Sequence, residues 1–382
     1  MLYMVALGSA LSAMGNSFRY IAIMALITQG VDSKTGVLRV ALLTAAALLP
    51  NVAVGRRAGI IVQKIGAKRT LILAETGRAL LTLAFPIFPF AGMLIVNVCF
   101  SLFSALYAAG FGSFVPTIVS DRGLVRGNSV MGVAQQAAGI LGPALAGWTV
   151  AGFGTRAPFY VDSVSFLINA MVFAFTRSTG KASDSEAETN REDNHRLPPS
   201  AAKMMWAAGI GSFCGMLAGV AFPVLFLQYL RLGIGTFGTL MSINACGAIF
   251  MGIFLGTRKG LRASYSHFYA GMGGVGVAML IIGVAKFLWL TSFALFLGGL
   301  GNGAIDVVFP TLLQNRLKPS VLPIAFGVAN AWQRGGQMLA LLLSTALSQE
   351  LPVQVLLVVG AVGYLSMVVV GMGSLRGQSD WK

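Results

Sequence analysis

Residues 55–69 read GRRAGIIVQKIGAKR. Five of these residues are basic and none is acidic, although only 10% of the whole chain is charged. The stretch lies between two long apolar segments, one ending near Leu49 and Pro50 and the next beginning near Leu71. A cluster of this kind is typical of a nucleic-acid-binding face in a soluble protein, or of a cytoplasmic loop in a membrane protein.

The composition favours the membrane protein. The chain has 382 residues, of which 56% are hydrophobic, and its mean hydropathy is +0.79. Its apolar runs have the length of about 20 residues that a helix needs to cross a hydrocarbon core, and backbone groups in lipid must be satisfied within the segment. The sequence therefore predicts an all-α membrane protein. The predicted spans are 3–29, 36–55, 70–90, 92–118, 129–152, 157–176, 204–230, 236–256, 267–285, 288–313, 321–347 and 353–374.

The positive charge follows the loops between these spans. If the N-terminus is cytoplasmic, 19 of the 27 Lys and Arg residues fall on the inner side and five on the outer side. This asymmetry predicts that both termini are cytoplasmic. We therefore expect a multi-pass protein of the bacterial inner membrane, with the lipid bilayer and not nucleic acid as its surroundings, and we interpret 55–69 as the loop between the second and third spans.

The chain divides into two similar halves. A charged, Ser- and Pro-containing segment, 177–202, predicts a cytoplasmic linker between bundles formed by 1–176 and 203–382. The halves share short similar sequence segments, among them GRRAG beginning at Gly55 and GTRKG beginning at Gly256. Parallel six-helix repeats suit a transporter that rocks two bundles around a central site.

The opening stretch resembles the loop signature of the major facilitator superfamily, G-x-x-x-D-[RK]-x-G-[RK]-[RK]. Glycines let two helix ends approach closely, and the cations anchor the loop at an anionic leaflet. The family's acid is replaced by Gln63, which implies a weaker latch of the inner gate. The residues of this gating-loop motif are Gly59, Gln63, Lys64, Gly66, Lys68 and Arg69.

The fifth span resembles the G-P-x-x-G-G motif of exporters in that family, through Gly139, Gly142, Pro143 and Gly147. Small residues there permit close helix packing. Together with residues of the sixth span, the motif is similar to the branch containing the enterobactin exporter and macrolide-efflux proteins. The resemblance implies the major facilitator fold, with twelve transmembrane helices in two pseudo-symmetric six-helix bundles.

Ionisable side chains inside spans are costly and are candidates for function. Glu75 and Arg78 are spaced to pair with each other, and we interpret Asp162, near the outer end of its span, as a second structural charge that meets Arg156 or the membrane interface. The candidates for substrate binding or coupling are Asn16, Arg19, Asn302, Asp306, Asn330 and Arg334. A fixed Asp306–Arg334 ion pair is the alternative for that pair of residues. The excess of arginine over acid on the first and eleventh spans favours anionic or zwitterionic substrates.

We expect no catalytic residues, no metal site and no cofactor, because the chain has only two histidines and contains no P-loop. The sequence predicts a monomeric, proton-coupled secondary active transporter that exports an amphiphilic small molecule, such as an antibiotic or a siderophore, by alternating access. An uptake symporter of the same fold is the nearest alternative. A membrane-embedded enzyme or lipid scramblase would require a cluster of polar side chains at one depth, which the sequence does not predict.

Overall fold

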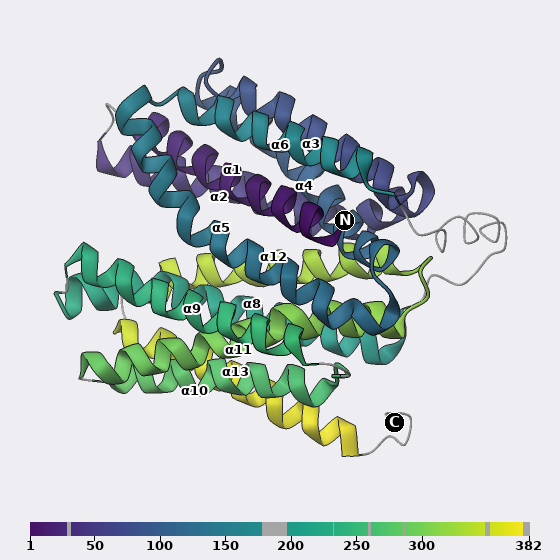
Figure 1. Ribbon diagram of the computed structural model, residues 1–382. Helices are drawn as coiled ribbons and strands as arrows, with labels where there is room; N and C mark the ends of the chain where they lie inside the picture. The colour runs from purple at the N-terminus through teal and green to yellow at the C-terminus, as the bar shows by residue number, and fades with distance from the viewer. Residues whose placement is uncertain are drawn as a thin grey trace. The chain divides into compact units, whose positions relative to one another are not determined.

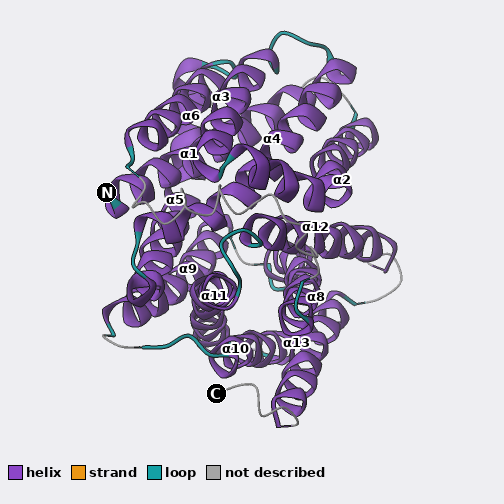
Figure 2. Ribbon diagram, turned by 90° about the vertical axis from the view of Figure 1, so that its right-hand side faces the viewer, coloured by secondary structure: helices purple, strands orange, loops and turns teal. Residues whose placement is uncertain are grey.

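A computed structural model describes residues 1–28, 32–177, 197–231, 233–258, 261–285, 287–347 and 352–376. Most of the predicted linker, 178–196, lies outside the described residues. Within the described parts of the chain, all regular structure is helical (Figure 2). The α-helices are α1 (Leu2–Thr28), α2 (Ser33–Ile65), α3 (Ala67–Ala84), α4 (Phe90–Ile118), α5 (Leu124–Phe153), α6 (Ala157–Phe175), α8 (Pro199–Pro223), α9 (Ile234–Thr257), α10 (Tyr265–Val284), α11 (Leu288–Arg316), α12 (Leu322–Leu347) and α13 (Val353–Arg376).

These helices match the twelve predicted spans one for one. Nine of the described helices are long and apolar enough to cross a membrane by length and composition alone. The remaining helices are α3, α5 and α12. α3 carries four charged side chains, and α12 carries the polar side chains of Asn330, Gln333, Arg334 and Gln337. The polar residues that reduce the hydropathy of these helices thus include several of the candidate functional residues.

The boundary of α2 differs from the prediction. We expected the span to end near residue 55 and a loop to follow, but α2 continues as a helix through the basic stretch to Ile65. It ends at Gly66, whose φ of 90° lies in a region that side chains disfavour. Long basic side chains reach water from a helix end, so charge alone did not mark the end of the helix. Pro50 lies inside α2 and does not terminate it.

The described chain separates into two compact units. The first comprises Met1–Gly127, Ala134–Pro198 and Arg316–Ala331. In it α1 packs along α6, α2 along α4, and α3 against both α4 and α6 (Figure 1). Its core contains a group of aromatic side chains that are all buried. They are Phe85, Phe100, Phe159 and Phe166.

The second unit comprises Asn128–Val133, Pro199–Asn315 and Trp332–Lys382. Here α10 and α8 both pack along α13, which repeats the way α3 and α1 pack along α6 in the first unit. Glycines bring α9 and α11 together, because a methyl group on Gly299 or Gly303 would overlap the backbone of α9. A six-residue π-helical segment, Val224–Tyr229, continues α8.

Candidate functional site

Four charged side chains meet inside the first unit, contributed by α1, α3 and α6. We call them the buried charge network: Arg19, Glu75, Arg78 and Asp162. Two ion pairs hold it together, Arg78 Nη2 to Glu75 Oε2 at 2.6 Å and Arg19 Nε to Asp162 Oδ2 at 3.4 Å. Both carboxylate side chains are 0% exposed. With every group ionised, the network has two positive and two negative charges and is neutral.

Glu75 lies at the well-bonded end of this network. Its Oε1 accepts hydrogen bonds from Asn169 Nδ2 at 2.6 Å and from Ser12 Oγ at 3.3 Å, while Oε2 faces Arg78. The i,i+3 spacing predicts the Glu75–Arg78 contact, and the structure contains it. Asn169 and Ser12 were not foreseen, although an asparagine in an otherwise apolar helix is a signal that could have identified Asn169.

Asp162 lies at the other end and pairs with Arg19, not with Arg156 or the membrane interface as expected from the sequence. Its Oδ2 also accepts a hydrogen bond from Thr82 Oγ1 at 3.3 Å. Its Oδ1 is buried and has no hydrogen-bond partner among the described residues. The sequence could not indicate this pairing, because it depends on how α1 and α6 are rotated toward each other.

Aromatic rings cover both arginines. The Arg19 guanidinium lies 3.8 Å from the centroid of Phe100, and that of Arg78 lies 4.4 Å from both Tyr107 and Phe166. A cation over an aromatic face is stabilised by the ring quadrupole, most strongly where water is excluded. Only 13% of the Arg19 side chain is exposed, and its Nη2 donates to Asn16 Oδ1 at 3.2 Å. Asp162 therefore neutralises the charge of Arg19. The excess of arginine over acid on the first and eleventh spans, from which the sequence favoured anionic or zwitterionic substrates, no longer includes Arg19.

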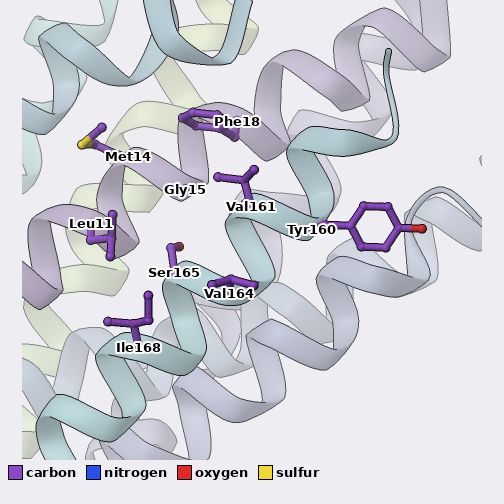
Figure 3. A pocket seen from close by; sticks show the side chains of 9 residues that line it. All are labelled: Leu11, Met14, Gly15, Phe18, Tyr160, Val161, Val164, Ser165 and Ile168. Atoms are coloured by element: carbon purple, nitrogen blue, oxygen red, sulfur yellow. The ribbon is translucent and has the colours of Figure 1, made fainter. Parts of the chain in front are cut away.

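A groove runs between α1 and α6 directly beside this network (Figure 3). Its volume is about 450 Å³, and apart from Ser165 and Tyr160 its lining is apolar. Gly15 on α1 and Ser165 on α6 both line it and lie close together. A methyl group on Gly15 would meet both Ser165 Oγ and Asp162 Oδ1, so the unpartnered carboxylate oxygen lies directly behind this part of the groove.

The gating-loop motif is built from the end of α2 and the start of α3. A methyl group on Gly59 would overlap the backbone of α12 at Ile324. Lys68 Nζ donates to the backbone carbonyls of Ala174 and Thr176, at 2.8 and 2.9 Å. It thereby binds the C-terminal end of α6, where carbonyl groups lack helical partners. Gln63 is half-buried in the last turn of α2, and Lys64 and Arg69 are exposed.

Side-chain amides also link several pairs of helices. Asn330 Nδ2 on α12 donates to Asn51 Oδ1 on α2 at 3.0 Å, and Asn51 Nδ2 donates to Ser101 Oγ on α4 at 2.6 Å. In the second unit, Asn128 Nδ2 lies 2.8 Å from Thr311 Oγ1 and 2.7 Å from Gln314 Oε1 on α11. Each of these contacts lies inside one unit and is uncharged.

The motif of α5 contacts α1 through one of its glycines. A methyl group on Gly142 would meet Ser17 and Met14 of α1. Among the described residues, no such neighbour lies within 4 Å of the corresponding position on Gly139 or Gly147, and Pro143 is accommodated inside the helix. The close approach therefore needs only one residue of the motif.

The other candidate residues lie on α11 and α12. Asn302 is half-buried and Asp306 is exposed on α11. Arg334 is exposed on α12, and its Nη1 donates to Gln337 Oε1 at 3.1 Å. Among the described residues, no group of three or more His, Cys, Asp and Glu side chains is placed to hold a metal ion.

Comparison with known proteins matches residues 5–341 to the family described as the Major Facilitator Superfamily. An uncharacterized transporter of this type, YfiS of Bacillus subtilis, is 21% identical over 83% of this chain and 79% of its own. A second, YvqJ of the same organism, is 22% identical over 77% of this chain and 74% of its own.

Solved structures share the fold. The human organic anion transporter MFSD10 superposes with a TM-score of 0.79 at 13% identity, covering 97% of this chain and 98% of its own. A bacterial homologue of the iron transporter ferroportin, in an outward-facing state with soaked iron, has the same score and identity and covers 99% of this chain and all of its own.

Proposed function

The chain belongs to the major facilitator superfamily, and from this membership we propose that it is a secondary active transporter that exports an amphiphilic small molecule across the bacterial inner membrane. The transport would use alternating access, with protons as the coupling ion. An antibiotic or a siderophore has the required chemistry. The excess of basic residues on one set of loops supports an orientation with both termini cytoplasmic, and we propose that the protein works as a monomer.

The observation that carries the proposal of export is the contact of Gly142 with α1. In the resembled exporters a Gly-Pro motif occupies this place on the fifth span. Here Gly142 lies so close to Ser17 that a methyl group would overlap it, and Pro143 removes one backbone hydrogen bond next to the contact. A close and locally weakened crossing of this kind suits helices that bend or slide during transport.

Alternating access requires contacts that form and break. We propose bundles of 1–176 and 203–382 as the moving bodies, joined by the linker 177–202. The hydrogen bonds from Asn330 to Asn51 and from Asn128 to Thr311 each join a residue of 203–382 to a residue of 1–176, and both are neutral. Each is worth about 0.5–1.5 kcal/mol net. Such bonds can be exchanged for water without leaving a charge unpaired, which supports their role as a reversible latch.

The substrate would contact the polar residues of α1, α11 and α12. Asn16 and Arg19 share one face of α1, and Arg334 and Gln337 are joined on α12. A few polar contacts within an otherwise apolar surface suit an amphiphile. We propose Asn16, Arg19, Asn302, Asp306, Asn330 and Arg334 as the substrate and coupling residues.

The direction of transport is tested by accumulation of a radiolabelled or fluorescent amphiphile in cells that lack or overproduce the protein. Overproduction should lower retention, and everted membrane vesicles should accumulate the compound when energised. Raised retention in overproducing cells would instead identify an uptake symporter. Gly142→Ala should reduce efflux strongly while Gly139→Ala, one turn away on the same helix, should not, because a methyl group on Gly142 would meet α1 whereas one on Gly139 would meet no described atom within 4 Å.

A further inference from the structure

The two carboxylates of the buried charge network are held very differently. Glu75 has both oxygens engaged, by Asn169, Ser12 and Arg78. Asp162 has one oxygen that faces Arg19 at 3.4 Å and Thr82 at 3.3 Å, and one that has no described partner. Both side chains are equally buried, so the difference lies in their bonding alone.

An unpartnered carboxylate oxygen in a protein interior is costly, because it has lost water and gained nothing in return. A proton bound to Oδ1 removes the charge and converts the oxygen into a donor. Ser165 Oγ lies next to Oδ1 over Gly15, and a hydroxyl oxygen that donates elsewhere can still accept. Ser165 already donates to the Asp162 carbonyl at 2.7 Å, so its oxygen keeps acceptor capacity.

We infer that Asp162 is the proton-binding site of this transporter, an inference that rests on the proton-coupled function proposed above. A proton from water binds to Oδ1 and leaves by the reverse step, and no other bond changes. The charged groups that act on Asp162 are Arg19 from α1 and Arg78 and Glu75 from α3. The hydroxyl of Tyr107 on α4 belongs to the other end of the network, where it lies 3.5 Å from Ser9 Oγ and its ring faces Arg78. Protonation changes the charge of the network from zero to plus one.

The change reaches the substrate through Arg19. Asp162 is fully buried and cannot touch a substrate, whereas Arg19 is partly exposed and bonds Asn16. A cationic amphiphile beside Arg19 is repelled less when Asp162 is ionised than when it is neutral. By reciprocity of linked equilibria, binding of that cation promotes release of the proton. Exchange of a proton for a cationic amphiphile then follows without direct competition for one site, and Asp162 is a positioning residue for Arg19.

The assignment of the proton site is tested without any substrate. Infrared difference spectra of the purified full-length protein, recorded between acidic and alkaline pH, should contain the band of a protonated buried carboxyl group. The band should be lost in Asp162→Asn and kept in the double variant Glu75→Gln, Arg78→Met, which replaces the other ion pair of the network without leaving a charge unpaired. A spectrum without this band, or a band that survives Asp162→Asn, would overturn the assignment.

The linkage to substrate charge is tested with tetraphenylphosphonium as the probe cation. Added to weakly buffered wild-type protein with a pH indicator, it should release up to one proton per bound probe, and Asp162→Asn should release none. Proton uptake, or failure to bind, would overturn the cationic class. These measurements on purified protein do not depend on the direction of transport, so cellular uptake in place of efflux would contradict the proposed function and leave the proton site standing.

Discussion

The two halves of this protein build the same helix packing with different chemistry. In the first half, α3 packs on α6 through polar groups along its whole length. Lys68 binds the end of α6, Glu75 binds Asn169, Ser163 binds the Ala79 carbonyl and Thr82 binds Asp162. In the second half, α10 packs on α13 through glycine and apolar side chains, with Gly276 against Tyr364 and Leu365, and Met279 against Gly360.

The spacing between Gly55 and Gly256 makes the contrast specific. When the residues of α3 are shifted along the sequence by the same offset, Glu75 corresponds to Gly276 of α10 and Arg78 corresponds to Met279 of α10. The fold therefore does not need a buried carboxylate or guanidinium at this interface, because the other copy of the repeat does without them. Buried ion pairs are weak evidence for stability and can often be replaced by apolar residues. The comparison thus favours a functional role for the charges of the first half.

Breaking one member of the well-bonded pair should have the largest effect. Arg78→Met leaves Glu75 buried without its cation, at a cost of roughly 3–5 kcal/mol. We expect little folded protein in membranes, measured as the monodisperse fraction after extraction. The double variant Glu75→Gln, Arg78→Met should recover most of it. Met279→Leu, the matched change in the second half, should cost less than about 1.5 kcal/mol. Equal losses for Arg78→Met and Met279→Leu would remove the contrast between the halves.

A methyl group in the glycine interface of the second half should have the next largest effect. Gly299→Ala would place its Cβ against the carbonyl of Asn244 and the backbone at Ala248. Overpacking of this kind costs about 1–3 kcal/mol and should lower the melting temperature of the purified protein. Gly219→Ala on α8, with no described atom within 4 Å of its Cβ position, is the control and should be neutral or slightly stabilising. An unchanged melting temperature for Gly299→Ala would show that the helices separate easily there.

The same contrast explains what could be predicted from the sequence. Twelve helices follow from the length of the apolar runs, because in lipid each run must form its backbone hydrogen bonds within itself. The Glu75–Arg78 pair was predictable because both residues lie on one helix turn. The Arg19–Asp162 pair was not, because its partners are on helices that meet only after folding. The end of α2 was misplaced because its basic residues were interpreted as a loop, whereas Gly66 is where the helix ends.

Lys68 offers a smaller test at the end of the α3–α6 interface. Lys68→Met keeps an apolar stem of similar length and removes both bonds to the carbonyls of Ala174 and Thr176. Because the group is partly exposed, water replaces much of the interaction, and we expect a loss of about 1 kcal/mol. Lys64→Met, which changes an exposed lysine of the same basic stretch, should leave the melting temperature unchanged. An equal decrease in the melting temperature of both variants would indicate an effect of net charge and not of the contact with α6.

The smallest effect should come from Thr82→Val, which removes the hydroxyl that donates to Asp162 Oδ2 while keeping nearly the same volume. The bond is 3.3 Å long, which is beyond the usual range for a hydroxyl donor, so its loss should cost no more than about 1 kcal/mol. Thr149→Val on α5 is the matched control, because the bond that its hydroxyl donates among the described residues stays within its own helix, to the carbonyl of Leu145. If Asp162 is as loosely held as its contacts indicate, the melting temperatures of both variants should lie close to that of the wild type. A loss for Thr82→Val as large as that for Arg78→Met would mean that Asp162 is held as firmly as Glu75, and the distinction between the two carboxylates would then fail.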